Sequence, residues 1–156
     1  MIVRNIPHYF ATLCMVFWVG GIWAVGYIAV PALFHSLPDR QQAGLLAGKM
    51  FTWMAYVGFS CAAYLLSYQI HQFGRMALKQ KSFLLTAVML VLLLIGQLGI
   101  QPIMVELKAQ AFPHDVMQSA LASQFKVLHG LASILYLLQS LLGVALVISE
   151  APKKNI

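Results

Sequence analysis

The sequence predicts an all-α protein, an integral membrane bundle of four antiparallel helices. Of its 156 residues, 61% are hydrophobic and 9% are charged, whereas soluble domains carry about 25% charged residues. Four windows without Asp, Glu, Lys or Arg are each long enough to cross a hydrocarbon core: 9–30, 50–70, 83–105 and 127–149. We therefore expect helices over about 9–30, 45–71, 83–105 and 115–149, within a single transmembrane domain that covers residues 1–156.

The first window is too long for a signal-peptide core and lacks a convincing cleavage site, so we expect it to be a helix. Gly20, Gly21 and Gly26 are small residues that allow a neighbouring helix to approach closely. Pro31 follows the window, and proline cannot donate the next helical hydrogen bond. The sequence therefore predicts that the first helix closes at Pro31.

The second window carries polar and aromatic residues along one side. On a helical wheel they fall within roughly 80° of one another: Lys49, Trp53, Tyr56, Ser60, Tyr64, Ser67 and His71. The ends of this polar seam lie roughly 33 Å apart, close to the thickness of a hydrocarbon core. Because hydrocarbon cannot satisfy these polar groups, we expect the seam to face the inside of the bundle. Alternatively, the aromatic residues only pack, and the hydroxyls bond to their own helix.

The turn before the second helix ends at Pro38, and Ser36 is a candidate N-cap there. Gly44 and Gly48 then form a GxxxG pair, which favours contact with another helix.

The third window carries Gln97 and Gln101 one turn apart. Such carboxamides within a membrane typically hydrogen-bond to a neighbouring helix. Pro102 predicts a kink or an end of this helix.

The longest connection, residues 106–126, precedes the fourth window and contains a helix start near residues 113–115. A second polar seam follows, again within roughly 80° on the wheel: His129, Ser133, Tyr136, Ser140 and Gly143. We expect the two seams to face each other across the bundle.

The net charge of +6 comes from Lys and Arg residues scattered singly around the helix ends. No basic stripe forms, so we expect no nucleic-acid partner. Six of these ten residues lie on the side of the termini and four on the other side, and the positive-inside rule then places both termini in the cytoplasm. We expect a multi-pass protein of a bacterial inner membrane.

The strong catalytic signatures are absent: there is no phosphate loop, nucleophile elbow, HExxH or CxxC. No window contains a carboxylate, which argues against a proton-coupled transporter. The sequence does not predict an enzyme on these grounds.

Weaker constellations indicate a metal ion or haem. Imidazole ligands on the predicted outer side would come from His35, His114 and His129, with nearby carboxylates at Asp39, Glu106 and Asp115. A soft-sulfur face suited to Cu(I) would come from Met50, Met54 and Cys61, although Met also fills ordinary cores. Axial ligands to haem b would be His8 with His71, or His35 with His129.

Several short motifs resemble a family of small four-helix membrane proteins of unestablished function, which includes a eukaryotic transmembrane protein associated with cisplatin resistance. The motifs are Leu33-Phe34-x-Ser36-Leu37-Pro38, Gly44-Leu45, Lys49-Met50-Phe51 and Phe125-x-x-x-His129-Gly130-Leu131-x-Ser133. The turn between Pro38 and Lys49 is one residue longer than in the eukaryotic relative. The four-helix plan is more remotely similar to copper-resistance D and HemJ-like membrane proteins, which implies copper or haem. The resemblance implies that any functional role of the family's motif residues would fall on Lys49, Phe125, His129, Gly130 and Ser133.

Three hypotheses for function follow. The first is binding or permeation of a metal ion, metal complex or haem, with ligand-binding residues drawn from both seams: Lys49, Trp53, Tyr56, Ser60, His129, Ser133 and Tyr136. The second is a non-catalytic structural or assembly subunit of a membrane complex. The third is a haem-dependent membrane oxidoreductase. The expected partners are the lipid bilayer and either further copies of the chain or another membrane protein.

Overall fold

A computed structural model describes residues 6–112 and 114–150. Within these ranges the regular structure is entirely helical. The elements in chain order are α1 (Ile6–Trp23), η2 (Ala24–Ala29), α2 (Val30–Ser36), α3 (Arg40–Phe73), η3 (Gly74–Lys79), α4 (Lys81–Leu94), η4 (Ile95–Ile100), α5 (Gln101–Ala111), η5 (Val116–Gln118) and α6 (Ala122–Glu150). The prediction of an all-α protein is confirmed for the described residues.

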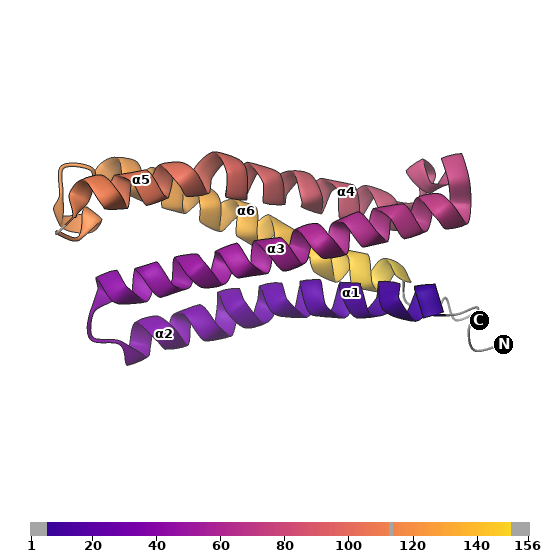
Figure 1. Cartoon of the computed structure of the whole chain (residues 1–156), viewed down its shortest axis with the longest axis horizontal. Helices are drawn as coiled ribbons and strands as arrows, with labels where there is room; N and C mark the ends of the chain where they lie inside the picture. The colour runs from indigo at the N-terminus through magenta and orange to yellow at the C-terminus, as the bar shows by residue number, and fades with distance from the viewer. Residues whose placement is uncertain (1–5, 113, 151–156) are drawn as a thin grey trace.

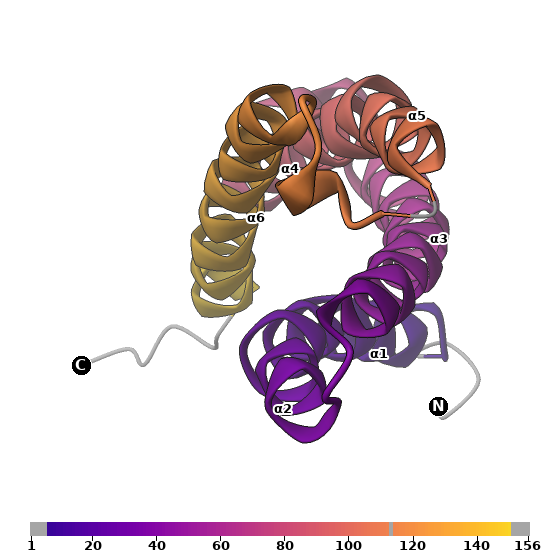
Figure 2. The ribbon, with the colours of Figure 1, turned by 90° about the vertical axis from the view of Figure 1, so that its left-hand side faces the viewer.

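These elements join into four continuous helical segments that are long and apolar enough to cross a membrane: Ile6–Ser36, Arg40–Lys79, Lys81–Ala111 and Ala122–Glu150. Figure 1 shows that the chain travels the length of the molecule once in each segment. The start of α1 and the end of α6 lie at one end, which we call the terminal end; the α2–α3 and α5–α6 connections lie at the other, which we call the loop end. Seen from the loop end, α1 with α2, α3, α4 with α5, and α6 surround a common axis (Figure 2).

The first three helices extend beyond the predicted bounds at the loop end, whereas the fourth begins at Ala122 and not at about residue 115. The expectation that Pro31 closes the first helix is wrong, because helical structure continues to Ser36. The element before Pro31 is the π-helix η2, and the π-helix η4 precedes Pro102 in the same way. A proline ring collides with the carbonyl four residues earlier in a regular α-helix, and a widened π turn makes room for the ring. Two helices therefore pass their prolines without ending.

The caps of the loop end also differ from the expectation. Asp39, and not Ser36, is the N-cap of α3, and its carboxylate accepts hydrogen bonds from the backbone N–H groups of Gln41 and Gln42 at 2.8 and 3.3 Å. The connection after Ala111 contains one short helix, η5, whose N-cap carboxylate is Asp115. The predicted helix start covered residues 113–115, and Pro113 lies outside the residues that the structure describes.

The core divides into two clusters along the molecule. The larger one joins α1, α3, α4 and α6 around the fully buried Trp18, with Cys61, Leu65, Met89 and Leu146. The smaller one joins α5, η5 and α6 at the loop end through Met104, Leu107, Ala111, Val116 and Phe125. A segment of 31 residues, such as Lys81–Ala111, is roughly 46 Å long, whereas a hydrocarbon core is about 30 Å thick. The segments are therefore long enough to carry the smaller cluster beyond the hydrocarbon core.

Candidate functional site

The polar seam of α3 points away from the rest of the chain. Trp53 is 71% exposed and Tyr56 is 54% exposed; Lys49, Ser60, Ser67 and His71 are exposed as well. Of the seam residues, Tyr64 is partly buried, and its hydroxyl donates to the Pro7 carbonyl oxygen at 3.0 Å. The expectation that this seam faces the inside of the bundle is therefore wrong for this chain.

The opposite side of α3 packs inward because its residues are small or apolar. Gly58, Cys61 and Leu65 are buried. A Cβ atom added at Gly58 would lie 2.7 Å from Trp18 Nε1 and 2.8 Å from Leu93 Cδ2. Only a glycine admits the Trp18 ring at this depth, and this contact turns the bulky polar seam outward.

Two serine hydroxyls of the seams bond to their own helix. Ser60 Oγ donates to the Tyr56 carbonyl oxygen at 3.0 Å, and Ser133 Oγ donates to the His129 carbonyl oxygen at 2.8 Å. Both side chains are exposed. For these two residues the alternative interpretation, in which the hydroxyl satisfies its own backbone, is confirmed.

The outward surfaces of α4 and η4, and of α6 beyond Ser133, are aliphatic. Exposed side chains of α4 and η4 include Leu84, Val91 and Leu98, and those of α6 include Ile134, Leu141 and Ile148. The outward surface of α3 instead carries residues that we call the α3 face: Lys49, Trp53, Tyr56, Ser60, Ala63, Ser67 and His71. The α3 face thus presents a cation, two large aromatic rings, three small side chains and an imidazole, whereas α4 and the second half of α6 present aliphatic side chains.

A partly buried cluster of aromatic and hydroxyl side chains joins the end of α1 and η2 to α6. Tyr136 Oη donates to the Ile22 carbonyl oxygen at 2.5 Å, at the junction between α1 and η2. Tyr27 Oη and Ser140 Oγ share a hydrogen bond of 2.8 Å, and Trp23 Nε1 donates to the Ser140 carbonyl oxygen at 3.4 Å. These three bonds connect two helices whose backbone groups are otherwise engaged within each helix.

Tyr136 is packed on two further sides. The ring of Phe51 meets it edge-on, with centroids 5.1 Å apart, and a Cβ atom added at Gly26 would overlap the Tyr136 ring. In the second seam Ser140 and Gly143 are buried and Tyr136 is partly buried, while His129 and Ser133 are exposed. The expectation that the two seams face each other is therefore wrong, because the α3 seam lies on the outside.

Sequence reasoning missed Trp23, Tyr27 and Phe51 as members of this cluster. The available signal was the spacing of Trp23 and Tyr27, which places both on one side of a helical turn, with Gly26 beside them.

At the loop end, Lys108 connects three elements. Its Nζ donates to the Gly44 carbonyl oxygen of α3 at 3.2 Å and lies 5.4 Å from the centroid of the Phe125 ring of α6. The His129 ring stacks on the Phe125 ring, with centroids 6.0 Å apart and 10° between the planes. The sequence identified Lys108 only as a topology signal.

The GxxxG pair also faces α5. Gly44 receives the Lys108 hydrogen bond, and a Cβ atom added at Gly48 would lie 3.7 Å from Gln101 Nε2. The pair therefore faces α5, and among the described residues it is Lys108, and not Gln97 or Gln101, that donates a hydrogen bond across this contact.

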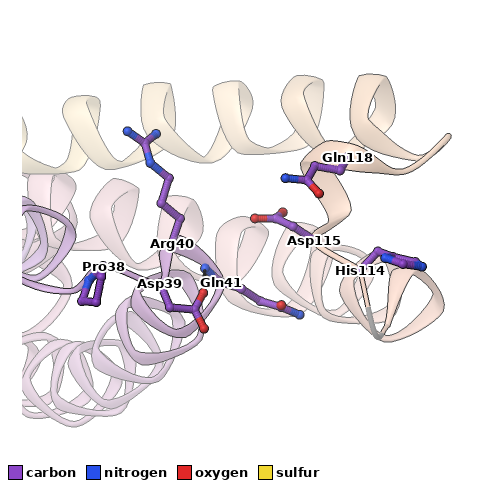
Figure 3. A pocket seen from close by; sticks show the side chains of 7 residues that line it. All are labelled: Pro38, Asp39, Arg40, Gln41, His114, Asp115 and Gln118. Atoms are coloured by element: carbon purple, nitrogen blue, oxygen red, sulfur yellow. Dashed lines mark hydrogen bonds between the residues drawn. The ribbon is translucent and has the colours of Figure 1, made fainter.

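An open pocket of about 440 Å³ lies at the loop end (Figure 3). Residues from the start of α3 lie across from residues of the α5–α6 connection; the lining comprises Pro38, Asp39, Arg40, Gln41, His114, Asp115 and Gln118. The carboxylates of Asp39 and Asp115 accept backbone N–H groups as helix caps. The lining therefore offers one guanidinium, one imidazole, two carboxamides and the second oxygen of each carboxylate.

The predicted metal ligands are spread over several elements. His35 is exposed at the end of α2, His114 lines the pocket and His129 stacks on Phe125. In the part of the chain that the structure describes, no three or more His, Cys, Asp or Glu side chains are grouped to hold a metal ion. Met50 is partly buried, while Met54 and Cys61 belong to the larger core cluster. His8 and His71, the proposed haem ligands, are both exposed on α1 and α3.

Comparison with known proteins gives one match. Residues 13–113 match a family model described as a domain of unknown function, DUF4149. No curated protein and no solved structure matches the chain. The matched range covers α3 and the Lys108 contact with Gly44, whereas Phe125 and the His-Gly-x-x-Ser motif that begins at His129 lie beyond it.

Proposed function

Because the chain belongs to the DUF4149 family of unknown function, we propose from its own geometry that it is a non-catalytic assembly subunit, which binds another membrane protein through the α3 face. The observation that carries this proposal is the contrast between the α3 face and the aliphatic outward surfaces of α4 and of α6 beyond Ser133. In a bilayer those aliphatic surfaces would contact lipid.

Helix association in membranes depends on close packing and hydrogen bonding, since lipid tails are as apolar as leucine. Small residues at an interface allow backbones to approach closely, and Ser60, Ala63 and Ser67 supply them on the α3 face. Aromatic side chains are enriched among the residues that dominate protein interfaces. The Trp53 and Tyr56 rings lie edge to face with centroids 6.0 Å apart, next to these small residues.

The proposal includes insertion as an antiparallel four-helix bundle in a bacterial inner membrane, with both termini in the cytoplasm. The support is the length and apolarity of the four segments and the excess of Lys and Arg on the side of the termini. The closer likeness to the transmembrane proteins associated with cisplatin resistance is also part of this proposal, and its support is the set of short motifs.

Binding or permeation of a soft metal ion is a second candidate, favoured by a separate observation. Four sulfur-containing residues are buried in the larger core cluster: Cys14, Met15, Cys61 and Met89. Thiolate and thioether groups select Cu(I). Elemental analysis of the purified protein tests this candidate, and near-stoichiometric copper that is lost in Cys61→Ala would support it. A Soret band abolished by His8→Ala or by His129→Ala would instead support a haem protein or haem-dependent oxidoreductase.

The assembly proposal is tested by photocrosslinking in native membranes. A benzophenone amino acid at position 60 or 67 of the α3 face should give protein adducts. The same group at position 134 or 141 on the aliphatic surface of α6 should give lipid adducts. If positions 60 and 67 also give only lipid adducts, the α3 face contacts lipid and the assembly role is wrong.

A further inference from the structure

We propose that the partner of the α3 face is a membrane-spanning helix of a different protein, and that this helix carries a carboxylate at the level of Lys49. This inference rests on the proposed assembly function. It identifies the chemistry that the partner needs and distinguishes it from a second copy of this chain.

The first step is the charge of the α3 face. Lys49 is its one permanently charged residue, and none of the seven residues that define the face is a carboxylate. The Lys49 side chain is exposed and has no hydrogen bond to another described residue. An ammonium group near the membrane boundary is stabilised by an opposite charge, and more strongly where water is partly excluded. A partner that covers this surface therefore needs an acidic group there.

The second step is the surface beside Lys49. A shallow hollow of about 270 Å³ is lined by Gln42, Leu45, Leu46 and Lys49, all on α3. Leu45 is 51% exposed and Leu46 is 43% exposed. Leu45 and Leu46 would contact the methylene groups of a partner side chain, while Lys49 beside them would meet its carboxylate.

The third step concerns a second copy. Two copies with the same membrane orientation pair through a two-fold axis along the membrane normal, which places the same residues of the two surfaces near each other. Lys49 would then approach Lys49 of the other copy, and the α3 face offers no carboxylate to compensate. Like charges at an interface disfavour a partner. Charge complementarity therefore favours a heterologous helix.

The partner helix also needs small or hydroxyl-bearing residues further along its length. Ser60, Ala63 and Ser67 lie between Tyr56 and His71 on the exposed side of α3. Their short side chains leave the backbone accessible over roughly 10 Å of helix. A bulky helix surface would lose this contact.

The experiment uses the full-length protein, labelled with a donor fluorophore, in phosphatidylcholine vesicles. The probe is a synthetic Leu- and Ala-rich transmembrane peptide with Ser at the facing positions, an acceptor fluorophore, and either Glu or Gln at the level of Lys49. Energy transfer over a range of peptide-to-lipid ratios gives the apparent affinity. The Glu peptide should bind roughly fivefold more tightly than the Gln peptide, because a partly desolvated ion pair stabilises association.

Matched variants assign this preference to a single side chain. Lys49→Gln should abolish the difference between the two peptides, and Lys49→Glu should reverse it in favour of a Lys-bearing peptide. Lys126→Gln removes an exposed lysine of α6 and should leave the preference unchanged. Equal binding of the Glu and Gln peptides to the unmodified protein would overturn the inference.

Failure of the inference is distinguishable from failure of the assembly role. Energy transfer between donor- and acceptor-labelled copies of the chain, lost in Ser60→Leu, would show that the α3 face binds itself, so the heterologous partner is wrong and the assembly role stands. If positions 60 and 67 give only lipid adducts in native membranes, both the assembly role and the inferred acidic partner helix are wrong.

Discussion

At the scale of single residues, glycines decide which side of a helix can face its neighbours. Gly58 and Gly130 are both interior to long helices, and they look alike in the sequence. A Cβ atom at Gly58 would meet Trp18 and Leu93, whereas one at Gly130 would have nothing within 4 Å. The same residue type therefore has a packing role at one position and none at the other.

Gly58→Ala should destabilise the protein by about 1–3 kcal/mol, because the added methyl group overpacks the Trp18 contact. Gly130→Ala, the matched control, should be neutral or stabilising by up to about 1 kcal/mol, since alanine has the higher helix propensity. Thermal unfolding in detergent measures both. Equal unfolding temperatures for the two variants would show that the packing of the Trp18 ring does not require a glycine at position 58.

Tyr136→Phe should lower stability by about 0.5–1.5 kcal/mol, because it removes the hydrogen bond to the Ile22 carbonyl oxygen. Tyr56→Phe is the control, since the Tyr56 side chain is 54% exposed. Denaturant titration in mild detergent gives the comparison. If Tyr56→Phe lowers the free energy of unfolding as much as Tyr136→Phe does, the hydrogen bond of Tyr136 to Ile22 makes no special contribution to stability.

At the scale of elements, two prolines sit inside continuous helical segments. Pro31 and Pro102 each follow a six-residue π-helix, which absorbs the steric conflict that would otherwise end the helix. The first of these π-helices also presents Tyr27 to Ser140. The local distortion thus serves an interhelical contact as well as the proline.

Lys108 connects α5 to α3 and α6 at the loop end. Lys108→Met should destabilise the protein by about 1.5–3 kcal/mol, the range for hydrogen bonds to charged groups, because it removes the donor to the Gly44 carbonyl oxygen and the cation over Phe125. Lys108→Arg keeps the charge and should retain most of the stability.

The control for this prediction is Lys126→Met, which removes an exposed lysine from α6 and should change the unfolding midpoint little. Calorimetry of the three variants in the same detergent makes the comparison. A loss in Lys126→Met that equals the loss in Lys108→Met would assign the effect to net charge and not to the Gly44 contact.

At the scale of the whole molecule, the basic residues divide between the two ends. Arg75, Lys79 and Lys81 lie at the end where α1 starts, and Arg40 and Lys108 lie toward the loop end. Under the proposed orientation, an impermeant maleimide applied to intact cells should label Met117→Cys and not Leu78→Cys. Both side chains are exposed, and the two native cysteines, Cys14 and Cys61, are buried.

Labelling of Leu78→Cys alone would reverse the orientation. Labelling of both variants in cells made permeable shows that each cysteine is reactive, which separates topology from burial. Labelling of neither variant in permeable cells would indicate that both positions are covered by a partner.

The sequence by itself determined the helical class and the four candidate membrane segments, because each depends only on composition and on runs of uncharged residues. It also indicated that Gly44 and Gly48 face another helix, without identifying that helix. These features are local, so they can be recognised along one dimension of the chain.

Only the tertiary structure decided which face of each helix points inward. The wheel of α3 contains a polar side and an apolar side, and the sequence favoured burial of the polar side; the close fit of Trp18 against Gly58 buries the other. Lys108 and Tyr27 acquire their partners from residues 64 and 113 positions away. Such pairings depend on the packing of all four segments together, which no local pattern specifies.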